Sequence, residues 1–548
     1  MRGDPMLTGH PSTMADDYQL NVTTMLRHAA RSFPETEIVY RDDRGAWQRS
    51  NYAVEYGRVA QMAHALSGLG VAPGDVVGVL DWNSRRHLEL YFALPGLAAT
   101  HLQLNIKLSR EDLAYVVEHS GAQWVVVDES LLPLAEGIQD AENIKGWIIA
   151  SDTPGGRTET SLPNPVYLED LMIDESDSYD WEEIEESSAA YAGYTTGTTG
   201  RPKGIFYSHR SVCVHSWALH TALSFTHRDC LMPVTPMFHA MTWGFLHAAV
   251  LAGSKVVMPG QYAASDVGPL AEALVDEGVT VSNGSPAIWT PILEYFRARA
   301  EPVDLSGLRV VVAGSEPALA LMKGFKEAAG ADIVHGYGAS ETSPIVAINW
   351  LRKRSLDDMA EADWWDLKRS QGLPSAGTDI KIMSLDGIEQ PHDGVSAGEV
   401  YYKGPYITQE YFDRPEAADA FEDGWWRSGD VGVIDPNGYL KLTDRLKDVI
   451  KSGGEWISSI DMENAILDNP AVAEAAVIGV PDEKWDERPV AYVVAREGNT
   501  VDADTVRTTL STRFAKWQLP DRVVVVDELP RTSVGKLNKK KLRSDDAV

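Results

Sequence analysis

Short runs of β-branched and other apolar residues alternate with amphipathic stretches over most of the chain. The apolar runs are VVGVL (76–80), WVVVD (124–128), GWIIA (146–150) and RVVVAG (309–314). Residues 56–69 and 85–97 instead repeat apolar positions at three- and four-residue spacing, which is typical of helices with one buried face. Alternation of buried strands with helices predicts parallel sheets covered by helices, an α/β fold.

Two places interrupt this alternation. Residues 169–188 form an acidic run, for which we predict a solvated connector. A boundary falls near residues 443–447, after the turn sequence DPNG (435–438), and three more apolar runs follow at 472–480, 488–495 and 521–529. A chain of 548 residues exceeds what one hydrophobic core usually serves. We predict a large domain, residues 1–443, and a small α+β domain, residues 444–548.

Composition places the chain among globular proteins, with 44% hydrophobic and 24% charged residues. No apolar run approaches the roughly 18 residues that a membrane-spanning helix needs, and the N-terminus has no apolar signal region. Met14 is a second candidate for the initiating methionine. Cys213 and Cys230 are too few for a disulfide framework, so we interpret both as structural and expect a soluble, cytoplasmic protein.

The net charge of −31 argues against nucleic acid or an anionic membrane surface as partners, because both attract basic patches. Two interpretations of the acidic composition stay open. It is typical of proteins from a salt-rich habitat, whose acidic surfaces stay hydrated and repel one another, and equally of an acidic cytosolic enzyme.

The segment YTTGTTGRPKG (194–204) is the first motif with evident chemistry. Glycines among hydroxyl side chains form a loop that can offer backbone N–H groups and hydroxyls to phosphate oxygens, and Lys203 adds a positive charge. A Walker A motif would need glycine in place of Pro202 and serine or threonine in place of Gly204. The segment therefore predicts a phosphate-binding loop of another kind.

The segment HGYGASETSP (335–344) follows a strand end that we predict at residues 332–334, where α/β sheets bind ligands. Tyr337 offers a ring face to a purine, and Glu341 offers a hard oxygen ligand to magnesium.

The third motif consists of two neighbouring segments, WWRSGDVG (425–432) and LTDRLKDVIKSGGEWIS (442–458). Asp430 can accept hydrogen bonds from ribose hydroxyls, and Arg445 can pair with oxygens of the same nucleotide. Residues 444–448 lie at the predicted domain boundary, which suits a hinge. Finally, RTSVGKLNKKKL (531–542) places Lys536 after a glycine in a C-terminal loop.

In this order and at this spacing, the four motifs resemble those of the adenylate-forming superfamily of acyl-CoA synthetases, adenylation domains and luciferases. The resemblance extends over nearly the whole chain. DRLKDVIKSGGEWISSIDME (444–463) and PMFHAMTW (236–243) are most similar to long- and medium-chain fatty acyl-CoA synthetases. The resemblance implies a large N-terminal domain of helix-covered sheets plus a distorted β-barrel, with a small hinged α+β C-terminal domain.

The resemblance also implies residue roles. Catalytic roles fall to Lys536, which would bridge the carboxylate and the α-phosphate, and to Lys203, Glu341 and Thr195, the last two also holding Mg²⁺. Nucleotide-binding roles fall to Thr195, Thr196, Gly197, Thr198, Thr199, Gly200, Lys203, Ser315, His335, Gly336, Tyr337, Ser340, Asp430, Arg445, Lys447, Lys451, Trp456 and Lys536. Acyl-pocket roles fall to His239, Ala240, Trp243, Gly338 and Ala339, with Gly244 and Phe245 beside them.

This chain departs from the family pattern at two of these positions. Ser340 stands where the family usually has threonine, so the hydroxyl is kept and the methyl group is lost. His335 replaces a more common amide residue, which changes one hydrogen bond to the nucleotide. Lys447 matches the hinge, and Trp243 matches a gate position of long-chain enzymes.

The implied reaction joins ATP, a carboxylic acid and coenzyme A into acyl-CoA, AMP and diphosphate through an acyl-adenylate. The acyl pocket has no acidic partner for an ammonium group, so fatty or aryl acids are favoured over amino acids. The partners are then small molecules: the acid, ATP and CoA, with no nucleic acid. Chain length and oligomeric state, a homodimer included, stay open.

Four alternatives remain. One is an aryl- or short-chain-acid CoA ligase, and another is an adenylation enzyme that loads a carrier protein, although no carrier segment follows Lys541. A third is a luciferase-like monooxygenase. The fourth is a non-catalytic nucleotide-binding relative, against which the retained Lys203, Glu341 and Lys536 argue.

Overall fold

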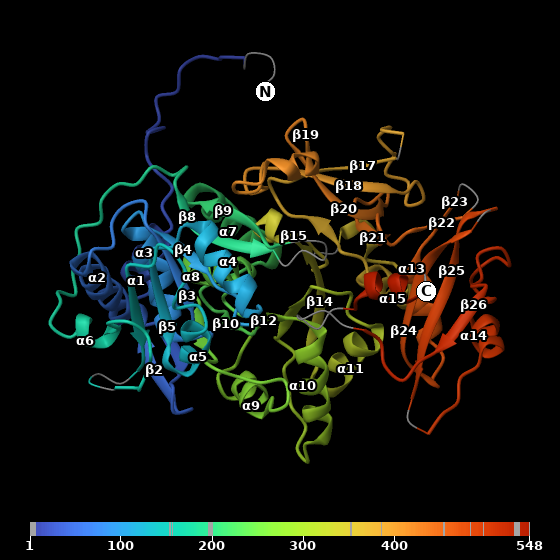
Figure 1. Ribbon diagram of the computed structural model, residues 1–548, viewed down its shortest axis with the longest axis horizontal. Helices are drawn as coiled ribbons and strands as arrows, with labels where there is room; N and C mark the ends of the chain where they lie inside the picture. The colour runs from blue at the N-terminus through green and yellow to red at the C-terminus, as the bar shows by residue number, and fades with distance from the viewer. Residues whose placement is uncertain are drawn as a thin grey trace.

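The computed structural model describes residues 7–152, 155, 157–195, 201–350, 353–384, 386–452, 455–482, 484–496, 498–530 and 537–546. The strands of these residues form four sheets, and helices pack against them. Figure 1 shows the two large sheets in blue to yellow, the third sheet in orange, and the last sheet in orange-red at one end of the molecule. The predicted α/β fold, with a large N-terminal part and a smaller C-terminal domain, is confirmed.

Two large, mainly parallel sheets build the N-terminal part. The nine-stranded sheet has the order β16 (Leu373–Pro374), β15 (Ile345–Ile348), β14 (Asp332–Gly338), β13 (Arg309–Val312), β12 (Val281–Gly284), β10 (Cys230–Pro233), β11 (Lys255–Met258), β1 (Glu37–Arg41) and β2 (Trp47–Asn51). The seven-stranded sheet has the order β7 (Val166–Tyr167), β6 (Gly146–Ala150), β5 (Trp124–Asp128), β3 (Val76–Leu80), β4 (Thr100–Gln103), β8 (Ala189–Thr195) and β9 (Lys203–Ser208). Among these described strands, antiparallel pairing occurs only at or next to the sheet edges and involves β2, β15, β16 and β9.

The third sheet is antiparallel and corresponds to the implied distorted barrel. Its order is β17 (Asp379–Met383), β18 (Gly398–Lys403), β20 (Trp425–Ile434) and β19 (Phe421–Glu422), with β21 (Leu440–Arg445) paired to β20. The predicted turn at residues 435–438 joins β20 to β21, and Gly438 adopts a φ of 87° that favours glycine there. A bridge between Gly372 and Leu440 connects this sheet to the nine-stranded one.

The last sheet begins at Ile450 and has a hydrophobic core of its own, with Val477 and Ala491 among the buried residues. Its strands are β23 (Glu455–Ile457), β22 (Ile450–Ser452), β25 (Asp486–Ala495), β24 (Val472–Asp482) and β26 (Arg522–Val525). Each of the three apolar runs in this region contains a strand, although the run 521–529 is a strand only over Arg522–Val525. The boundary at residues 443 and 444 stays a prediction.

Helices pack on the faces of the sheets. The α-helices are α1 (Thr23–Ser32), α2 (Tyr52–Leu69), α3 (Arg85–Gly96), α4 (Arg110–Ser120), α5 (Leu132–Glu136), α6 (Leu168–Met172), α7 (His209–Leu223), α8 (Phe245–Ala252), α9 (Gly268–Asp276), α10 (Pro286–Ala298), α11 (Leu319–Ala329), α12 (Glu361–Lys368), α13 (Ser459–Leu467), α14 (Ala503–Leu510) and α15 (Lys539–Asp546). Short 3₁₀ turns are η1 (Glu129–Leu131), η2 (Ala240–Gly244), η3 (Ser340–Thr342), η4 (Arg354–Leu356) and η5 (Pro415–Ala420). No helix among the described residues is both long and apolar enough to span a bilayer.

Local sequence signals explain where these elements begin and end. β3, β5 and β6 occupy the predicted ranges, and residues from β3, β11, α1, α2, α3 and α8 share one apolar core between the two large sheets. Asn51 and Ser84 cap the N-termini of α2 and α3 through their side-chain oxygens. Gly70 ends α2 in the left-handed conformation, at a φ of 107°.

Two predictions about local structure were wrong in detail. The strand expected to end at residues 332–334 continues to Gly338, because β15 provides an antiparallel partner for residues 336–338. The segment HGYG therefore lies within β14. The acidic run at residues 169–188 is mainly a connector, but Glu169 is buried and lies 2.5 Å from Arg58, so this carboxylate has a structural role.

The same buried cluster contains Glu55, which is 1% exposed and lies beside Glu89. Burial, with a smaller contribution from the neighbouring Glu89 charge, raises the pKa of the Glu55 carboxyl to about 8. Between about pH 4.5 and pH 8 the folded protein keeps a proton that the unfolded chain loses. Raising the pH through this window therefore lowers the free energy of unfolding.

Glu55→Gln should remove this pH-dependent loss, because glutamine is neutral and of similar size. We expect the variant to gain stability over the parent between pH 5 and pH 8, by on the order of 3 kcal/mol across the window. Urea unfolding at a series of pH values, followed by tryptophan fluorescence, measures the difference. Glu118→Gln, at an exposed position on α4, is the control. A stability difference that does not change with pH would contradict a buried neutral Glu55.

Candidate active site

The hairpin of β8 and β9 brings together the two described ends of the glycine-rich segment. Thr195 and Lys203 are directly paired across the hairpin, so their side chains lie on the same face. Residues 196–200, which the sequence assigns to the same phosphate loop, lie outside the described residues. The pairing nonetheless places a hydroxyl and an ammonium group side by side at the base of that loop.

Glu341 lies in η3, close to this hairpin. The Tyr411 hydroxyl donates to Oε1 of Glu341 at 2.6 Å, and the Tyr207 hydroxyl on β9 donates to the Ser340 carbonyl at 3.0 Å. Burial raises the pKa of the Glu341 carboxyl, while the hydrogen bond from Tyr411 and the charge of Lys203 lower it. Lys203 Nζ lies 4.5 Å from the Tyr411 ring centroid. The structure thus brings Thr195, Lys203, Ser340 and Glu341 into one region.

A second group joins β14 to the third sheet. The Tyr337 hydroxyl donates to Oδ2 of Asp430, and Arg445 Nε lies 3.0 Å from Oδ1 of the same carboxylate. Asp430 and Arg445 are paired across β20 and β21, which fixes their separation. Burial and the Asp430 charge raise the pKa of Tyr337, so its hydroxyl remains a donor. The Arg445 charge also acts on Glu341, which puts the two groups within electrostatic reach.

Asp430→Asn should weaken nucleotide binding. The substitution removes the negative charge that holds Arg445 and one acceptor for a ribose hydroxyl, and hydrogen bonds to charged groups are worth about 1.5–3 kcal/mol. We expect the KM for ATP to rise roughly 10- to 100-fold, with the KM for the acid changed little. Steady-state kinetics with each substrate varied in turn provide the measurement. Asp419→Asn, an exposed carboxylate in η5, is the control. Equal increases in both KM values would contradict a nucleotide-side role.

His335 and Ser315 lie on the edge predicted to hold adenine. The buried imidazole of His335 lies with Nδ1 2.7 Å from the Arg369 carbonyl. Burial lowers the pKa of His335 to about 4, so at neutral pH the ring is uncharged and Nδ1 donates to that carbonyl. The imidazole therefore fastens the end of α12 to β14. Ser315 is exposed in the loop after β13.

Gly336 and Gly338 are glycines for packing reasons. A Cβ added at Gly336 would lie 2.5 Å from Cγ1 of Val311, and one at Gly338 would lie 1.8 Å from the Pro344 carbonyl oxygen. The second clash is with backbone and cannot be relieved by a rotamer change. Ala339 follows in the same strand connection, and its amide donates to the Pro344 carbonyl at 3.1 Å. These positions hold β14 and the turn after it close together.

The segment predicted to line the acyl pocket has an uncommon backbone. η2 is a left-handed turn, in which φ is 37° at Ala240, 56° at Met241, 47° at Thr242 and 63° at Trp243. Left-handed conformations cost roughly 1–2 kcal/mol per residue for non-glycine residues, so the surrounding structure must hold the turn in place. His239 is exposed, and Trp243 is partly buried against the core between the two large sheets.

Buried amide side chains hold this turn. Gln103 Oε1 accepts from the Met241 amide at 2.8 Å, and Asn283 Nδ2 donates to the Thr242 carbonyl at 2.9 Å. The Thr242 hydroxyl donates to the Thr235 carbonyl at 2.8 Å. These bonds come from both large sheets, since Gln103 lies on β4 and Asn283 on β12.

The remaining predicted residues lie toward the last sheet. Lys447 follows β21, and the charges of Asp448, Arg445 and Asp430 act on it while burial lowers its pKa. Lys451 is exposed on β22, and its backbone amide donates to Glu487 at 2.9 Å. Nothing in the contacts of Lys451 connects it to the Glu341 region. Lys536 and the side chain of Trp456 lie outside the described residues.

Two family models match this chain. Residues 26–412 match the model described as AMP-binding enzyme, and residues 461–536 match the AMP-binding enzyme C-terminal domain. The chain belongs to the AMP-binding enzyme family. The first match contains Thr195, Lys203 and Glu341, and the second ends at Lys536.

Several relatives of this AMP-binding enzyme are known CoA ligases. A long-chain-fatty-acid–CoA ligase of Thermus thermophilus is 39% identical, over 99% of this chain and 98% of the relative. A 3-methylmercaptopropionyl-CoA ligase of Ruegeria lacuscaerulensis is 36% identical, over 96% and 97% of the two chains. A medium-chain-fatty-acid–CoA ligase of Ectopseudomonas oleovorans is 34% identical, over 96% of each.

Solved structures agree on the fold. A fatty acyl CoA synthetase of Mycobacterium tuberculosis matches with a TM-score of 0.71 and 28% identity, over 96% of this chain and 98% of that one. The anthranilate CoA ligase AuaEII, solved with anthranoyl-AMP, matches with a TM-score of 0.82 over 98% and 99% of the chains. At 24% identity, the second likeness shows the fold alone.

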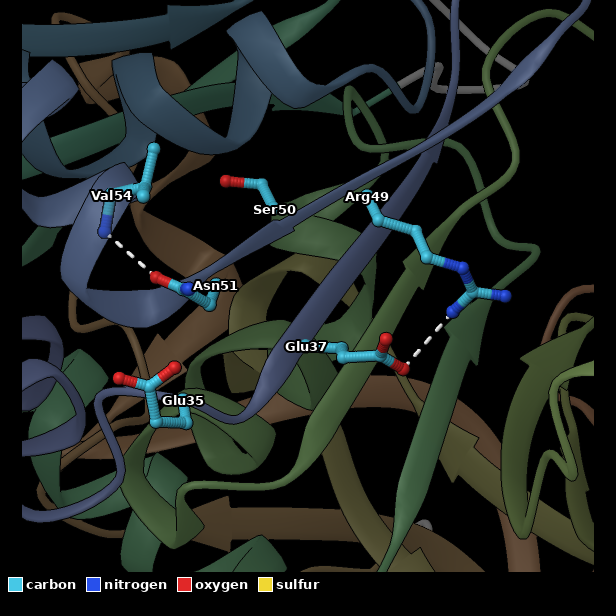
Figure 2. A pocket seen from close by; sticks show the side chains of 6 residues that line it. All are labelled: Glu35, Glu37, Arg49, Ser50, Asn51 and Val54. Carbon is cyan, nitrogen blue, oxygen red and sulfur yellow. Dashed lines mark hydrogen bonds and ion pairs between the residues drawn. The ribbon is translucent and has the colours of Figure 1, made fainter.

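Two surface hollows of the AMP-binding enzyme lie away from the predicted residues. Figure 2 shows one of about 350 Å³, formed where β1, β2 and the start of α2 meet, with Arg49 paired to Glu37 at 3.0 Å. The other, of about 400 Å³, is lined by residues that include Trp82 and Arg86. Neither hollow is lined by a residue predicted to bind the phosphates or the nucleoside. The candidate site is therefore defined by its charged and hydrogen-bonding side chains and not by the volume of a pocket.

The sequence analysis missed Tyr411 and Tyr207. Both contact the Glu341 turn, yet one lies in a loop and the other in a β-strand whose pattern of apolar residues gives no sign of a functional role. Their roles become evident only from the hydrogen bonds that connect β9 and the loop containing Tyr411 to η3.

Proposed function

We propose that this protein is an AMP-forming acyl-CoA synthetase that acts on a medium- or long-chain fatty acid. It would convert ATP, the acid and coenzyme A into acyl-CoA, AMP and diphosphate through an acyl-adenylate. The observation that supports this best is the convergence of Lys203 and Glu341 with the Tyr337–Asp430–Arg445 group at the meeting point of three sheets. The first group suits the phosphates of a nucleoside triphosphate, and the second suits its nucleoside.

The chemistry explains why cationic and hydrogen-bonding groups suffice. A carboxylate is a poor acyl donor because oxide would have to leave, and attack on the α-phosphorus replaces oxide with AMP as the leaving group. Negative charge then accumulates around phosphorus, and fixed positive groups stabilise it. Lys203 would provide one such group, while Asp430 and Tyr337 orient the nucleoside. No protein nucleophile is needed.

The residues present fit a magnesium ion held mainly by substrate. Mg²⁺ commonly uses one or two carboxylates plus nucleotide phosphates, rather than an all-protein cage. Among the described residues no cluster of three or more His, Cys, Asp or Glu side chains could hold a metal. Glu341 and Thr195 would therefore contact the ion, which when bound offsets phosphate charge.

The second step would transfer the acyl group to the thiol of coenzyme A. We assign residues 1–443 to ATP and acyl binding and residues 444–548 to a mobile domain that turns about Lys447. Arg445 is paired with Asp430 on one side of this point, and the last sheet begins at Ile450 on the other. A short connection between two separately packed cores suits a hinge.

The fatty-acid preference draws on the names of two relatives, a long-chain and a medium-chain ligase. A 3-methylmercaptopropionyl-CoA ligase at nearly the same identity keeps short acids open, and an aryl acid or a carrier-bound thiol stays an alternative. Use of ATP and CoA, with Cys213 and Cys230 both free and buried, fits a cytoplasmic location.

A panel of carboxylic acids tests the proposal. AMP release would be measured with ATP and Mg²⁺, with and without coenzyme A, for even-chain acids of four to eighteen carbons, one aryl acid and one amino acid. We expect CoA-dependent AMP release that is greatest for medium or long chains. Release only with an aryl acid or only with a carrier protein would support the corresponding alternative. No release with any acid would contradict acyl activation.

A further inference from the structure

The loop between β18 and η5 contains Tyr411, which touches both charged groups of the phosphate side. Its hydroxyl donates to Oε1 of Glu341 at 2.6 Å, and Lys203 Nζ lies 4.5 Å from its ring centroid. The side chain is 8% exposed, and its ring meets Phe421 edge-on with centroids 5.3 Å apart. One rigid side chain therefore contacts a cation through its face and an anion through its hydroxyl.

The backbone around Tyr411 is fastened to the same two segments. The Thr408 amide donates to the Glu341 carbonyl at 2.8 Å, and the Phe412 amide donates to the Gly204 carbonyl at 2.9 Å. Two side-chain and two backbone contacts thus connect residues 408–412 to η3 and to the start of β9. The loop sets the separation of Glu341 and Lys203, which come from distant parts of the sequence.

Opposite charges this close would normally pair and reduce each other's availability to a substrate. In the part of the chain that the structure describes, Lys203 and Glu341 form no direct ion pair, and each contacts Tyr411 instead. A cation over an aromatic face gains attraction without losing its charge. A hydroxyl that donates to one carboxylate oxygen fixes the carboxylate, which keeps further lone pairs for another ligand.

We propose that Tyr411 is a positioning residue that keeps Lys203 and Glu341 apart and directed at the same triphosphate, the ring acting on Lys203 and the hydroxyl on Glu341. This inference rests on the proposed function. It differs from simple packing in one respect: the two parts of the side chain have separate effects that can be removed one at a time.

Tyr411→Phe removes the hydroxyl and keeps the ring. Binding of a non-hydrolysable ATP analogue would be measured calorimetrically, with and without Mg²⁺. We expect binding without Mg²⁺ to stay within about twofold of the parent, and the tightening caused by Mg²⁺ to fall about tenfold, the scale of a hydrogen bond to a charged group. Tyr411→Leu removes the ring as well, and we expect it to weaken metal-free binding about fivefold through the loss of the cation–π contact.

Two double-mutant cycles assign each effect to its partner. If the hydroxyl acts through Glu341, Tyr411→Phe should change nothing further in a Glu341→Gln background. If the ring acts through Lys203, Tyr411→Leu should not weaken metal-free binding further in a Lys203→Met background. Tyr191→Phe is the matched control, since it removes another buried hydroxyl, one that donates to the Tyr91 carbonyl at 2.6 Å.

Thermal unfolding identifies variants that fail to fold. If Tyr411→Leu does not fold, Tyr411→Met, another apolar side chain without a ring, replaces it in the Lys203 cycle. The inference would be overturned if the parent binds the analogue and both Tyr411→Phe and the variant that lacks the ring bind it equally well, with and without Mg²⁺. Tyr411 would then have only a packing role. A parent protein that binds no nucleotide would instead contradict the proposed function itself.

Discussion

Lys536→Ala should slow adenylate formation by on the order of a hundredfold or more, the scale of losing a major charge stabiliser of the transition state. Thioester formation from a supplied acyl-adenylate should remain largely intact, because in the proposed function this half-reaction uses another orientation of the mobile domain, with Lys536 away from the phosphate. Lys536 itself lies outside the described residues, so this expectation rests on its motif and on the family match that ends at this residue.

The described residues on either side of the RTSVGK motif are fastened to each other and to α13. The Asn538 amide donates to the Pro530 carbonyl at 2.8 Å. Lys539 Nζ lies 2.7 Å from Glu463 and 2.6 Å from the Ser459 hydroxyl, so the start of α15 is fastened to α13.

Separate measurements of the two half-reactions test whether Lys536 acts only in adenylate formation. Pyrophosphate exchange reports adenylate formation, and conversion of a chemically made acyl-adenylate with coenzyme A reports the second step. Lys540→Ala, at an exposed neighbouring position in α15, is the control and should match the parent in both assays. Equal loss of both half-reactions in Lys536→Ala would contradict a role limited to adenylation and indicate a folding defect.

The elements that the sequence predicted well are those where local and global preferences agree. The runs at β3, β5 and β6 are β-branched, fully apolar in the middle and buried on both faces, so periodicity and burial point to the same structure. The turn at residues 435–438 likewise has Asp, Pro, Asn and Gly in places where each is favoured.

The sequence fails as a guide where distant segments decide the outcome. β14 extends to Gly338 only because β15 pairs with it, and the left-handed turn of η2 exists only because Gln103 and Asn283 hold its backbone. The positive φ of residues that are not glycine leaves no mark in the local sequence. Tyr411 escaped notice for the same reason, since its partners come from β9 and η3.

Trp243→Ala should shift acid preference toward longer or bulkier substrates, with ATP binding nearly unchanged. The indole is partly buried against the core between the large sheets, at the end of the left-handed turn predicted to line the acyl pocket. Removing it would open space along an apolar wall. Each additional buried methylene is worth about 0.8 kcal/mol, or roughly fourfold in kcat/KM, so a shift of four carbons would be plain in the ratios.

The backbone at residue 243 makes a second substitution informative. Trp243→Ala keeps a Cβ at a φ of 63°, whereas Trp243→Gly also relieves the strain of the left-handed turn. If the indole limits chain length as a wall, both variants should show the same shift in preference. If the shape of the turn matters more, the glycine variant should lose preference among acids altogether. Ratios of kcat/KM over even-chain acids and one aryl acid, for parent and both variants, distinguish these results.

Stability must be followed in the same variants, because a tryptophan in this position also packs against apolar neighbours. Trp217→Ala, at an exposed position on α7, controls for loss of an indole elsewhere and should leave the acid profile unchanged. If Trp243→Ala lowers thermal stability while its acid profile stays parallel to that of the parent, Trp243 is a core residue. The fatty-acid preference would then depend on the Gly338–Ala339 side of the pocket, because no other described residue of η2 presents a large apolar side chain that is only partly buried.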